Sequence, residues 1–210
     1  MTLPSTDSTP ERSSPDATTA KRPDWWLFLS KFLKGGTKIA SFAPSSRFMA
    51  RAIIDGIDYD NAKCIVELGA GTGPVTAELL KRVKPHTKLI IVERDKDFCD
   101  RLRLRFPQAD IVQADAAKLE EMLDSRGVDK ACHIVSGLPL PSFPVPLRNA
   151  VLASCAKRLS PEGTFRQLTV MPYVYWRMYR GYFASVRFKL VPLNLPPSGV
   201  YVCRGFKTKA

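Results

Sequence analysis

A glycine-rich run directly after a short apolar segment is the feature that most constrains how this chain can fold. The apolar residues 64–66 lead into Glu67-Leu68-Gly69-Ala70-Gly71-Thr72-Gly73, and a helical pattern follows over 74–83. Strand, glycine turn and helix in this order open a nucleotide-binding α/β sheet. The glycines let the backbone approach a ligand where a Cβ would collide. The spacing G-x-G-x-G, with an acid two positions before the first glycine, differs from the G-x-G-x-x-G of dinucleotide-binding turns.

Polar residues end the next three predicted strands. The strand at 88–93 ends in Glu93, about 20 positions past the glycines, where a carboxylate can accept hydrogen bonds from ribose hydroxyls. The strand at 110–113 leads to Asp115, and the strand at 131–136 leads into Ser136-Gly137-Leu138-Pro139. The carboxyl ends of parallel strands meet at one edge of a sheet, so we expect these residues around one ligand. Taken singly, Glu93 and Asp115 are also compatible with ordinary solvated turns.

Together these segments resemble the cofactor site of class I S-adenosylmethionine (SAM) methyltransferases. The resemblance implies that Asp115 takes a hydrogen bond from the adenine amino group and that Ser136 lies beside the sulfonium. It also implies an α/β, Rossmann-like fold: a seven-stranded, mostly parallel sheet with helices on both faces and N-terminal helices. The cofactor-binding residues expected are Ser41, Phe42, Glu67, Gly69, Ala70, Gly71, Thr72, Gly73, Glu93, Arg94, Asp115, Ala116, Ser136, Gly137 and Leu138.

Three segments are expected along the chain. A disordered tail, 1–22, is rich in Ser, Thr, Pro and Asp; amphipathic and capping helices occupy 23–56; and the SAM-dependent methyltransferase domain spans 57–210. Pro161-Glu162-Gly163 predicts a turn before the fifth strand. The remaining expected elements are helices at 45–55, 96–105, 116–124, 146–159 and 174–182, and strands at 163–171, 185–191 and 199–204.

An aromatic helix is predicted from Asp24, a suitable cap, to Lys34, just before Gly35. It either covers the sheet edge or lies in a membrane interface, where indole rings are favoured and lysines meet anionic lipid. The membrane-binding residues expected on the second interpretation are Trp25, Trp26, Phe28, Leu29, Lys31, Phe32 and Lys34.

Positive charge is concentrated in the last third of the chain. The net charge is +12, and residues 147–210 contain eleven Lys or Arg and one acid, Glu162, which gives +10. Such a one-sided field attracts the phosphates of nucleic acid or of an anionic membrane, although a basic face kept for solubility is the simpler alternative.

Neither a metal site nor a disulfide framework is expected, because the five cysteines are isolated and the two histidines do not cluster. His86 falls in a helix-to-strand loop, and His133 falls early in a strand as a core residue, so we expect no histidine general base. The first 20 residues lack an apolar stretch typical of a signal peptide, and no apolar run approaches the ~18 residues of a membrane span.

Several stretches across about residues 24–204 resemble the bacterial phospholipid N-methyltransferases, which make phosphatidylcholine from phosphatidylethanolamine. The resemblance implies SAM as cofactor, S-adenosylhomocysteine as product and up to three methylations. It further implies a cytoplasmic protein at the inner face of the membrane that favours anionic phospholipid, without an obligate protein partner. The matching stretches are Phe42-Ala43-Pro44-Ser45-Ser46, 66–76, Asp97-Phe98-Cys99, 112–116, 135–140, Gln167-Leu168-Thr169 and Asn194-Leu195-Pro196-Pro197.

Aromatic and basic residues after the fifth strand are candidates for the acceptor site. Methyl transfer to an amine needs positioning and loss of a proton, for which Tyr173, Tyr175 and Ser136 are the catalytic candidates. Trp176 and Tyr179 are candidates for an aromatic wall around the methylated ammonium. Arg177, Arg180 or Arg187 is suited to bind a lipid phosphate. The alternative for each aromatic is a core or membrane contact.

Other acceptors remain open. The rRNA adenine dimethyltransferases share the glycine motif and the basic charge, but they read N-L-P-Y where this chain reads Ser136-Gly137-Leu138-Pro139-Leu140. This chain therefore lacks their amide and their stacking ring, and nucleic acid is not the expected partner. A small-molecule acceptor, or another amine-bearing lipid such as an ornithine lipid, is a further alternative.

Overall fold

The computed structural model describes residues 44–170, 173–194 and 197–207, and its strands form one seven-stranded sheet in the order β3-β2-β1-β4-β5-β7-β6. Neighbouring strands from β3 to β5 pair in parallel, and β7 runs antiparallel to both β5 and β6. This confirms the expected fold class. The strands are β1 Cys64–Leu68, β2 Lys88–Glu93, β3 Asp110–Gln113, β4 Ala131–Ser136, β5 Leu159–Thr169, β6 Phe183–Val191 and β7 Ser198–Phe206.

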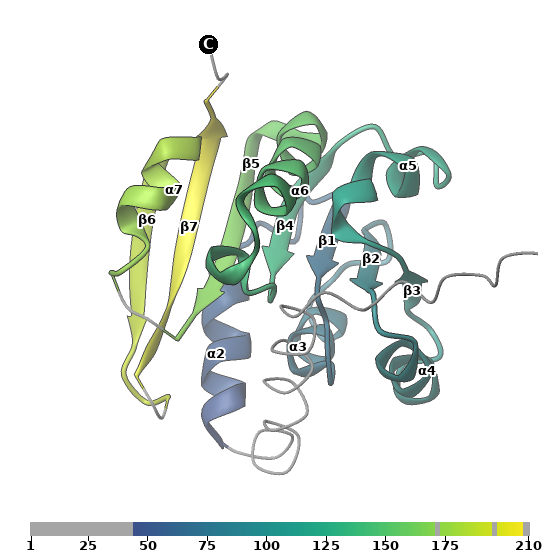
Figure 1. Ribbon diagram of the computed structural model, residues 1–210. Helices are drawn as coiled ribbons and strands as arrows, with labels where there is room; N and C mark the ends of the chain where they lie inside the picture. The colour runs from purple at the N-terminus through teal and green to yellow at the C-terminus, as the bar shows by residue number, and fades with distance from the viewer. Residues whose placement is uncertain (1–43, 171–172, 195–196, 208–210) are drawn as a thin grey trace, which may run out of the picture.

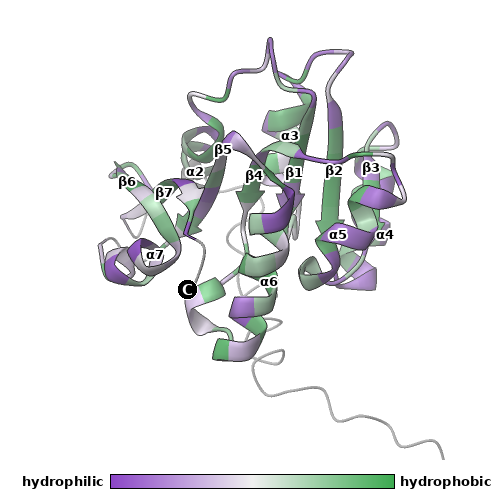
Figure 2. Ribbon diagram, turned by 90° about the horizontal axis from the view of Figure 1, so that it is seen from above, coloured by the Kyte–Doolittle hydropathy of each residue, from purple (hydrophilic) through white to green (hydrophobic). Residues whose placement is uncertain are grey.

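Helices cover both faces of the sheet. Residues of α5, α6 and α7 share one buried cluster with the sheet, whereas α2, α3 and α4 contribute to the two others. Figures 1 and 2 show α6 and α3 on opposite faces. The helices are α2 Pro44–Ile54, α3 Pro74–Leu80, α4 Lys96–Arg105, η1 Ala116–Lys118, α5 Leu119–Asp124, η2 Leu140–Ser142, α6 Val145–Arg158 and α7 Trp176–Tyr182.

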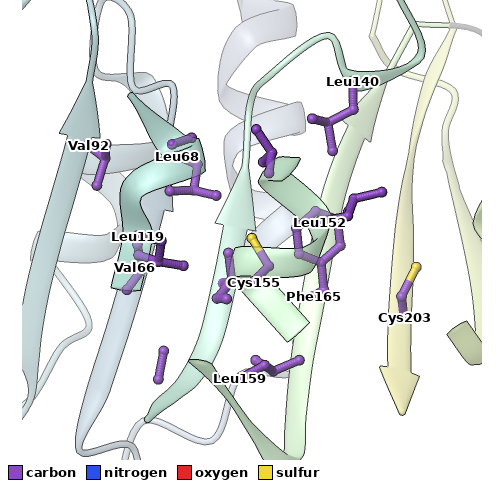
Figure 3. Close-up of a cluster of buried hydrophobic side chains, with 14 of the residues drawn as sticks. Val66, Leu68, Val92, Leu119, Leu140, Leu152, Cys155, Leu159, Phe165 and Cys203 are labelled. Carbon is purple, nitrogen blue, oxygen red and sulfur yellow. The ribbon is translucent and has the colours of Figure 1, made fainter. Parts of the chain in front are cut away.

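The largest cluster lies between α6 and the middle of the sheet. In Figure 3, Leu152 and Cys155 of α6 lie over β4 and β5, and Phe165 projects from β5 on the same face. The central strands are buried on both faces: all five residues of β1 are buried, and all but Glu67 are apolar. This is the expected pattern for a parallel sheet with helices on both sides.

A buried arginine holds α2 to the sheet. Arg166 of β5 donates hydrogen bonds to the carbonyl oxygens of Ile53, Asp55 and Gly56, at and just beyond the end of α2. Its Nε also donates to the Thr164 hydroxyl. A helix leaves its last carbonyl groups without intrahelical partners, and this guanidinium supplies donors for them.

Three predicted elements need correction. Pro161-Glu162-Gly163 is not a turn before the fifth strand, because β5 runs through it; the register shifts between Ala131, opposite Leu159, and His133, opposite Thr164. The extra residues form an irregularity inside the strand. The helix expected over 116–124 is divided into η1 and α5, and the helix from Pro74 ends at Leu80 rather than residue 83.

The tail at 1–22 and the aromatic helix from Asp24 to Lys34 lie outside the described residues. Within the described ranges, no helix has the length and apolarity that crossing a membrane requires.

Candidate active site

The glycine turn after β1 has a left-handed backbone and lies against the segment that follows β4. Gly69, Gly71 and Gly73 have φ angles of 72°, 56° and 80°. The Gly137 amide donates to the Leu68 carbonyl at 2.8 Å, and a Cβ on Gly137 would lie 2.7 Å from the Gly69 oxygen. Two turns from different strands can approach this closely only because both carry glycine.

Glu93, at the end of β2, holds the same turn from the other side. Its Oε2 accepts a hydrogen bond from the Gly71 amide at 2.9 Å, and its Oε1 accepts from the amides of Arg94 and Asp95. Burial raises the pKa of this carboxyl, and the three amide donors act in the opposite direction. Each carboxylate oxygen can accept more than one hydrogen bond, so Glu93 retains capacity for a ligand hydroxyl.

Glu67, the acid before the glycines, lies in the interior. Its Oε2 accepts a hydrogen bond from the Thr76 hydroxyl of α3 at 2.7 Å. Burial raises the pKa of the Glu67 carboxyl to about 7, and the charge of nearby Glu93 adds to the rise. A cation brought near a buried carboxyl favours its ionised form and therefore lowers its pKa.

One pocket opens where the predicted cofactor segments meet. Arg94 and Asp115 form an ion pair on its wall, with Nη1 and Oδ2 3.5 Å apart, and Asp115 also caps η1 through the Ala117 amide. The pocket is lined by Gly69, Val92, Glu93, Arg94, Ala114, Asp115, Ala116, Gly137, Leu138, Pro139, Phe143, Leu147 and Val151.

These residues fit the expected nucleoside cofactor. Carboxylates from β2 and the β3 end supply acceptors for hydroxyl and amino groups, and the apolar wall from Leu138 to Val151 supplies a surface for a flat base. The structure therefore brings Gly69, Glu93 and Asp115 together, as the sequence predicts. Glu67, Ala70, Gly71, Thr72, Gly73 and Ser136 lie behind or beside this lining, and Ser41 and Phe42 lie outside the described residues.

The wall contributed by α6 was missed at the level of sequence. Leu147 and Val151 are one helical turn apart on α6, and Phe143 lies four residues before Leu147. Phe143 itself lies in the extended segment before α6, so the available signal was the i, i+4 spacing of Leu147 and Val151, which places both on one face of the helix. It could not show that the face ends at a pocket rather than in the core.

Ser136 lies at the centre of a row of paired residues. It is fully buried at the end of β4, opposite Gln167 of β5, which in turn pairs with Tyr201 of β7. The Ser136 hydroxyl accepts from the Leu138 amide at 3.3 Å. Paired residues project from the same face, so the row leads from the Ser136 turn towards the aromatic residues near α7.

The aromatic segment before α7 forms a second, shallower depression. It is lined by Tyr173, Val174, Trp176 and Arg177. Tyr173 is 62% exposed, adopts a positive φ of 62°, and its ring centroid lies 4.4 Å from that of Phe188. A non-glycine residue in this conformation carries backbone strain, which is common at functional sites. The Tyr175 amide donates to the Tyr201 hydroxyl at 3.2 Å.

The other predicted acceptor-site residues are dispersed. Tyr179 is fully buried and its ring lies 4.8 Å from that of Tyr201, so it belongs to the core rather than to an exposed wall. Arg180 and Arg187 are exposed, and neither lines either depression. His133 is buried and bonded to Thr164, and burial lowers its pKa to about 4, which agrees with a core histidine.

Comparisons with known proteins identify the domain. A family model described as "Methyltransferase domain" matches residues 65–163. The ornithine lipid N-methyltransferase of Singulisphaera acidiphila is 48% identical over 187 residues, covering 88% of this chain and 97% of the relative. The ribosomal RNA small subunit methyltransferase A of Mycoplasma capricolum is 32% identical over 90 residues, which is 41% of this chain and 33% of that enzyme.

A solved structure shares the fold over nearly the whole chain. The 1,6-didemethyltoxoflavin-N1-methyltransferase of Burkholderia thailandensis, solved with its substrate and S-adenosylhomocysteine, superposes with a TM-score of 0.65. The sequence identity is 15%, and the match covers 93% of this chain and 95% of that one.

Proposed function

Because this chain belongs to the family of SAM-dependent methyltransferases that includes the Singulisphaera acidiphila ornithine lipid N-methyltransferase, we propose that it methylates the free amine of a lipid head group at a membrane surface. An ornithine lipid is the acceptor best supported. Phosphatidylethanolamine, the acceptor expected from sequence motifs, is the second candidate, since it offers an amine of the same chemistry.

The extent of the similarity to the lipid enzyme carries this proposal. The methyltransferase family model stops at residue 163, before most of β5, α7, β6 and β7. The lipid N-methyltransferase aligns over 187 residues and nearly its full length, so the likeness includes segments beyond the shared cofactor domain. The match to the rRNA enzyme covers 33% of that enzyme's length, as expected if the two proteins share the cofactor domain alone.

The cofactor is S-adenosylmethionine. When bound, it supplies a methyl group on a sulfonium sulfur; the N–C bond to the amine forms as the C–S bond breaks, and the amine loses one proton. The residues of this chain position the partners and exclude water, which can supply most of the acceleration. Glu93 and Asp115 would hold the nucleoside, and the turn from Ser136 to Leu138 would lie beside the reacting methyl group.

Exposed apolar side chains near the end of β5 support a membrane-facing surface. Tyr173 contacts Phe188 of β6, which brings the segment after β5 beside the β6–β7 hairpin, where Leu193 is 69% exposed. Arg177 lines the depression beside Tyr173, and lipid phosphates attract such a charge. The exposed apolar residues are Val170, Tyr173, Val174, Leu190 and Leu193.

A labelled-methyl assay tests the proposal. Purified protein is incubated with methyl-labelled SAM and vesicles of anionic lipid containing ornithine lipid or phosphatidylethanolamine, or with total RNA, followed by organic extraction and chromatography. We expect label in methylated ornithine lipid. Label confined to phosphatidylethanolamine would support lipid N-methylation but identify phosphatidylethanolamine as the acceptor. Label only in RNA would overturn the proposal. Glu93→Ala serves as the cofactor-site control and should lose label with every acceptor.

A further inference from the structure

Gln167 carries a buried acceptor that no described residue satisfies. The residue is 1% exposed, and its Oε1 has no hydrogen-bond partner in the part of the chain that the structure describes. A buried polar atom without a partner is costly and is rare in folded proteins. An atom of this kind in contact with the residues of an enzyme pocket points to a ligand that brings the missing donor.

The orientation of this amide is fixed by its other end. Nε2 donates to the Leu138 carbonyl at 2.7 Å and to the Leu168 carbonyl at 2.9 Å. Both partners are acceptors, so the nitrogen must face them, which identifies Oε1 as the atom left without a partner. The side chain therefore offers an oriented acceptor and cannot rotate without losing two hydrogen bonds.

Its place in the sheet puts Gln167 directly behind the residues that line the cofactor pocket. Leu138, whose carbonyl binds Gln167, lines that pocket, and Gln167 is paired with Ser136 on the neighbouring strand. It lies two residues from the carboxyl end of β5, the edge at which ligands bind in sheets of this kind. The other buried atom without a partner in the described chain is Tyr179 Oη, which lies on α7 with its ring against Tyr201.

We propose that Gln167 Oε1 accepts an N–H hydrogen bond from the acceptor amine and thereby orients the nitrogen lone pair towards the methyl group. This inference rests on the proposed function. A neutral amide does not take the amine proton, so Gln167 positions the substrate and another group or water receives the proton. Gln167 was not among the residues singled out for the site from sequence.

If Gln167 binds the substrate amine, its effect depends on how many N–H groups the head group carries, which would not be so if Gln167 only stabilised the fold. In the neutral state reached at alkaline pH, the unmethylated amine has two N–H groups, the monomethyl amine has one and the dimethyl amine has none. The trimethylammonium group has no N–H group at any pH. Loss of the Gln167 acceptor should therefore weaken recognition of the first two head groups and leave the N–H-free head groups unaffected.

The experiment compares wild-type protein with Gln167→Met, which keeps the length of the side chain and removes the Oε1 acceptor together with the two hydrogen bonds that Nε2 donates. Turnover is measured on vesicles of anionic lipid containing the unmethylated or monomethyl head group. Binding of the unmethylated and trimethylated lipids in micelles is measured in the presence of S-adenosylhomocysteine. Gln113→Met, an exposed position at the end of β3, is the matched control, and thermal unfolding and S-adenosylhomocysteine affinity report on folding.

We expect Gln167→Met to lower kcat/KM on unmethylated and monomethyl lipid about 10- to 100-fold, the loss typical of a hydrogen bond to a charged or reacting group. Binding of the trimethylated lipid and of S-adenosylhomocysteine should match the wild type. An equal loss of affinity for unmethylated and trimethylated lipid would assign Gln167 a structural role and overturn the inference alone. Absence of lipid methylation by the wild-type protein would overturn the proposed function, and this inference with it.

Discussion

The Glu93 carboxylate accepts a hydrogen bond from the Gly71 amide at 2.9 Å, although 22 positions separate the two residues. The end of β2 thereby sets the shape of the glycine turn that follows β1. The same carboxylate lines the pocket, so one side chain supports the turn and faces the ligand.

Glu93→Gln should weaken cofactor binding about tenfold or more. The new amide nitrogen faces backbone N–H groups on one side of the side chain and cannot accept from them, and hydrogen bonds to a charged acceptor are among the stronger ones. Calorimetric titration with S-adenosylhomocysteine measures the change. Glu121→Gln, an exposed position on α5, is the control. Equal affinity in the two variants would contradict the role given to Glu93.

Glu67→Gln should alter how stability depends on pH. Burial raises the pKa of Glu67 to about 7 from an ordinary value of 4.5, so the folded protein retains this proton to higher pH than the unfolded chain. The stabilisation associated with the protonated form is complete below about pH 4.5 and is lost as the pH rises through about 7.

The neutral amide of Glu67→Gln mimics the protonated form at every pH, and its oxygen can still accept from Thr76. Urea unfolding should show a variant that matches the wild type near pH 4 and exceeds it at pH 8, by up to about 3 kcal/mol. A constant difference across this range would show that Glu67 titrates normally.

Gly137→Ala should disturb the cofactor pocket. The added Cβ would lie 2.7 Å from the Gly69 carbonyl oxygen, which is backbone and cannot move aside without shifting the glycine turn. We expect a loss of about 1 to 3 kcal/mol in stability, together with weaker S-adenosylhomocysteine binding. Gly181→Ala is the matched control, because no atom lies within 4 Å of its added Cβ and alanine favours the helix. Both variants are compared by thermal unfolding; similar unfolding curves would contradict the close packing inferred here.

Arg177→Met should raise KM for lipid several-fold without changing SAM affinity. Arg177 lines the depression beside Tyr173 and Trp176, away from the nucleoside pocket, and a guanidinium suits an anionic head group. Vesicle assays at varied lipid concentration measure KM, and a separate titration measures SAM binding. Arg101→Met, exposed on α4, is the control. If lipid and SAM recognition fall together, Arg177 does not act on the lipid.

The sequence alone determined the frame of this protein. Three glycines at fixed spacing after an apolar strand, followed by Glu93 and Asp115 at the ends of later strands, are local patterns, and each specifies a turn or a strand end without help from distant residues. That is why the class of fold, the order of most elements and the meeting of Gly69, Glu93 and Asp115 at one edge of the sheet could be predicted before the chain was folded.

Only the tertiary structure decided which residues of different strands and helices contact one another. The pairing of Gln167 with Ser136, the wall supplied by Leu147 and Val151, and the burial of Tyr179 follow from which strands and helices become neighbours. No spacing in the sequence encodes those neighbours, because side-chain packing and hydrogen-bond satisfaction between distant segments fix them. An oriented, unpartnered acceptor at position 167 is visible only once Leu138 and Leu168 have taken its other end.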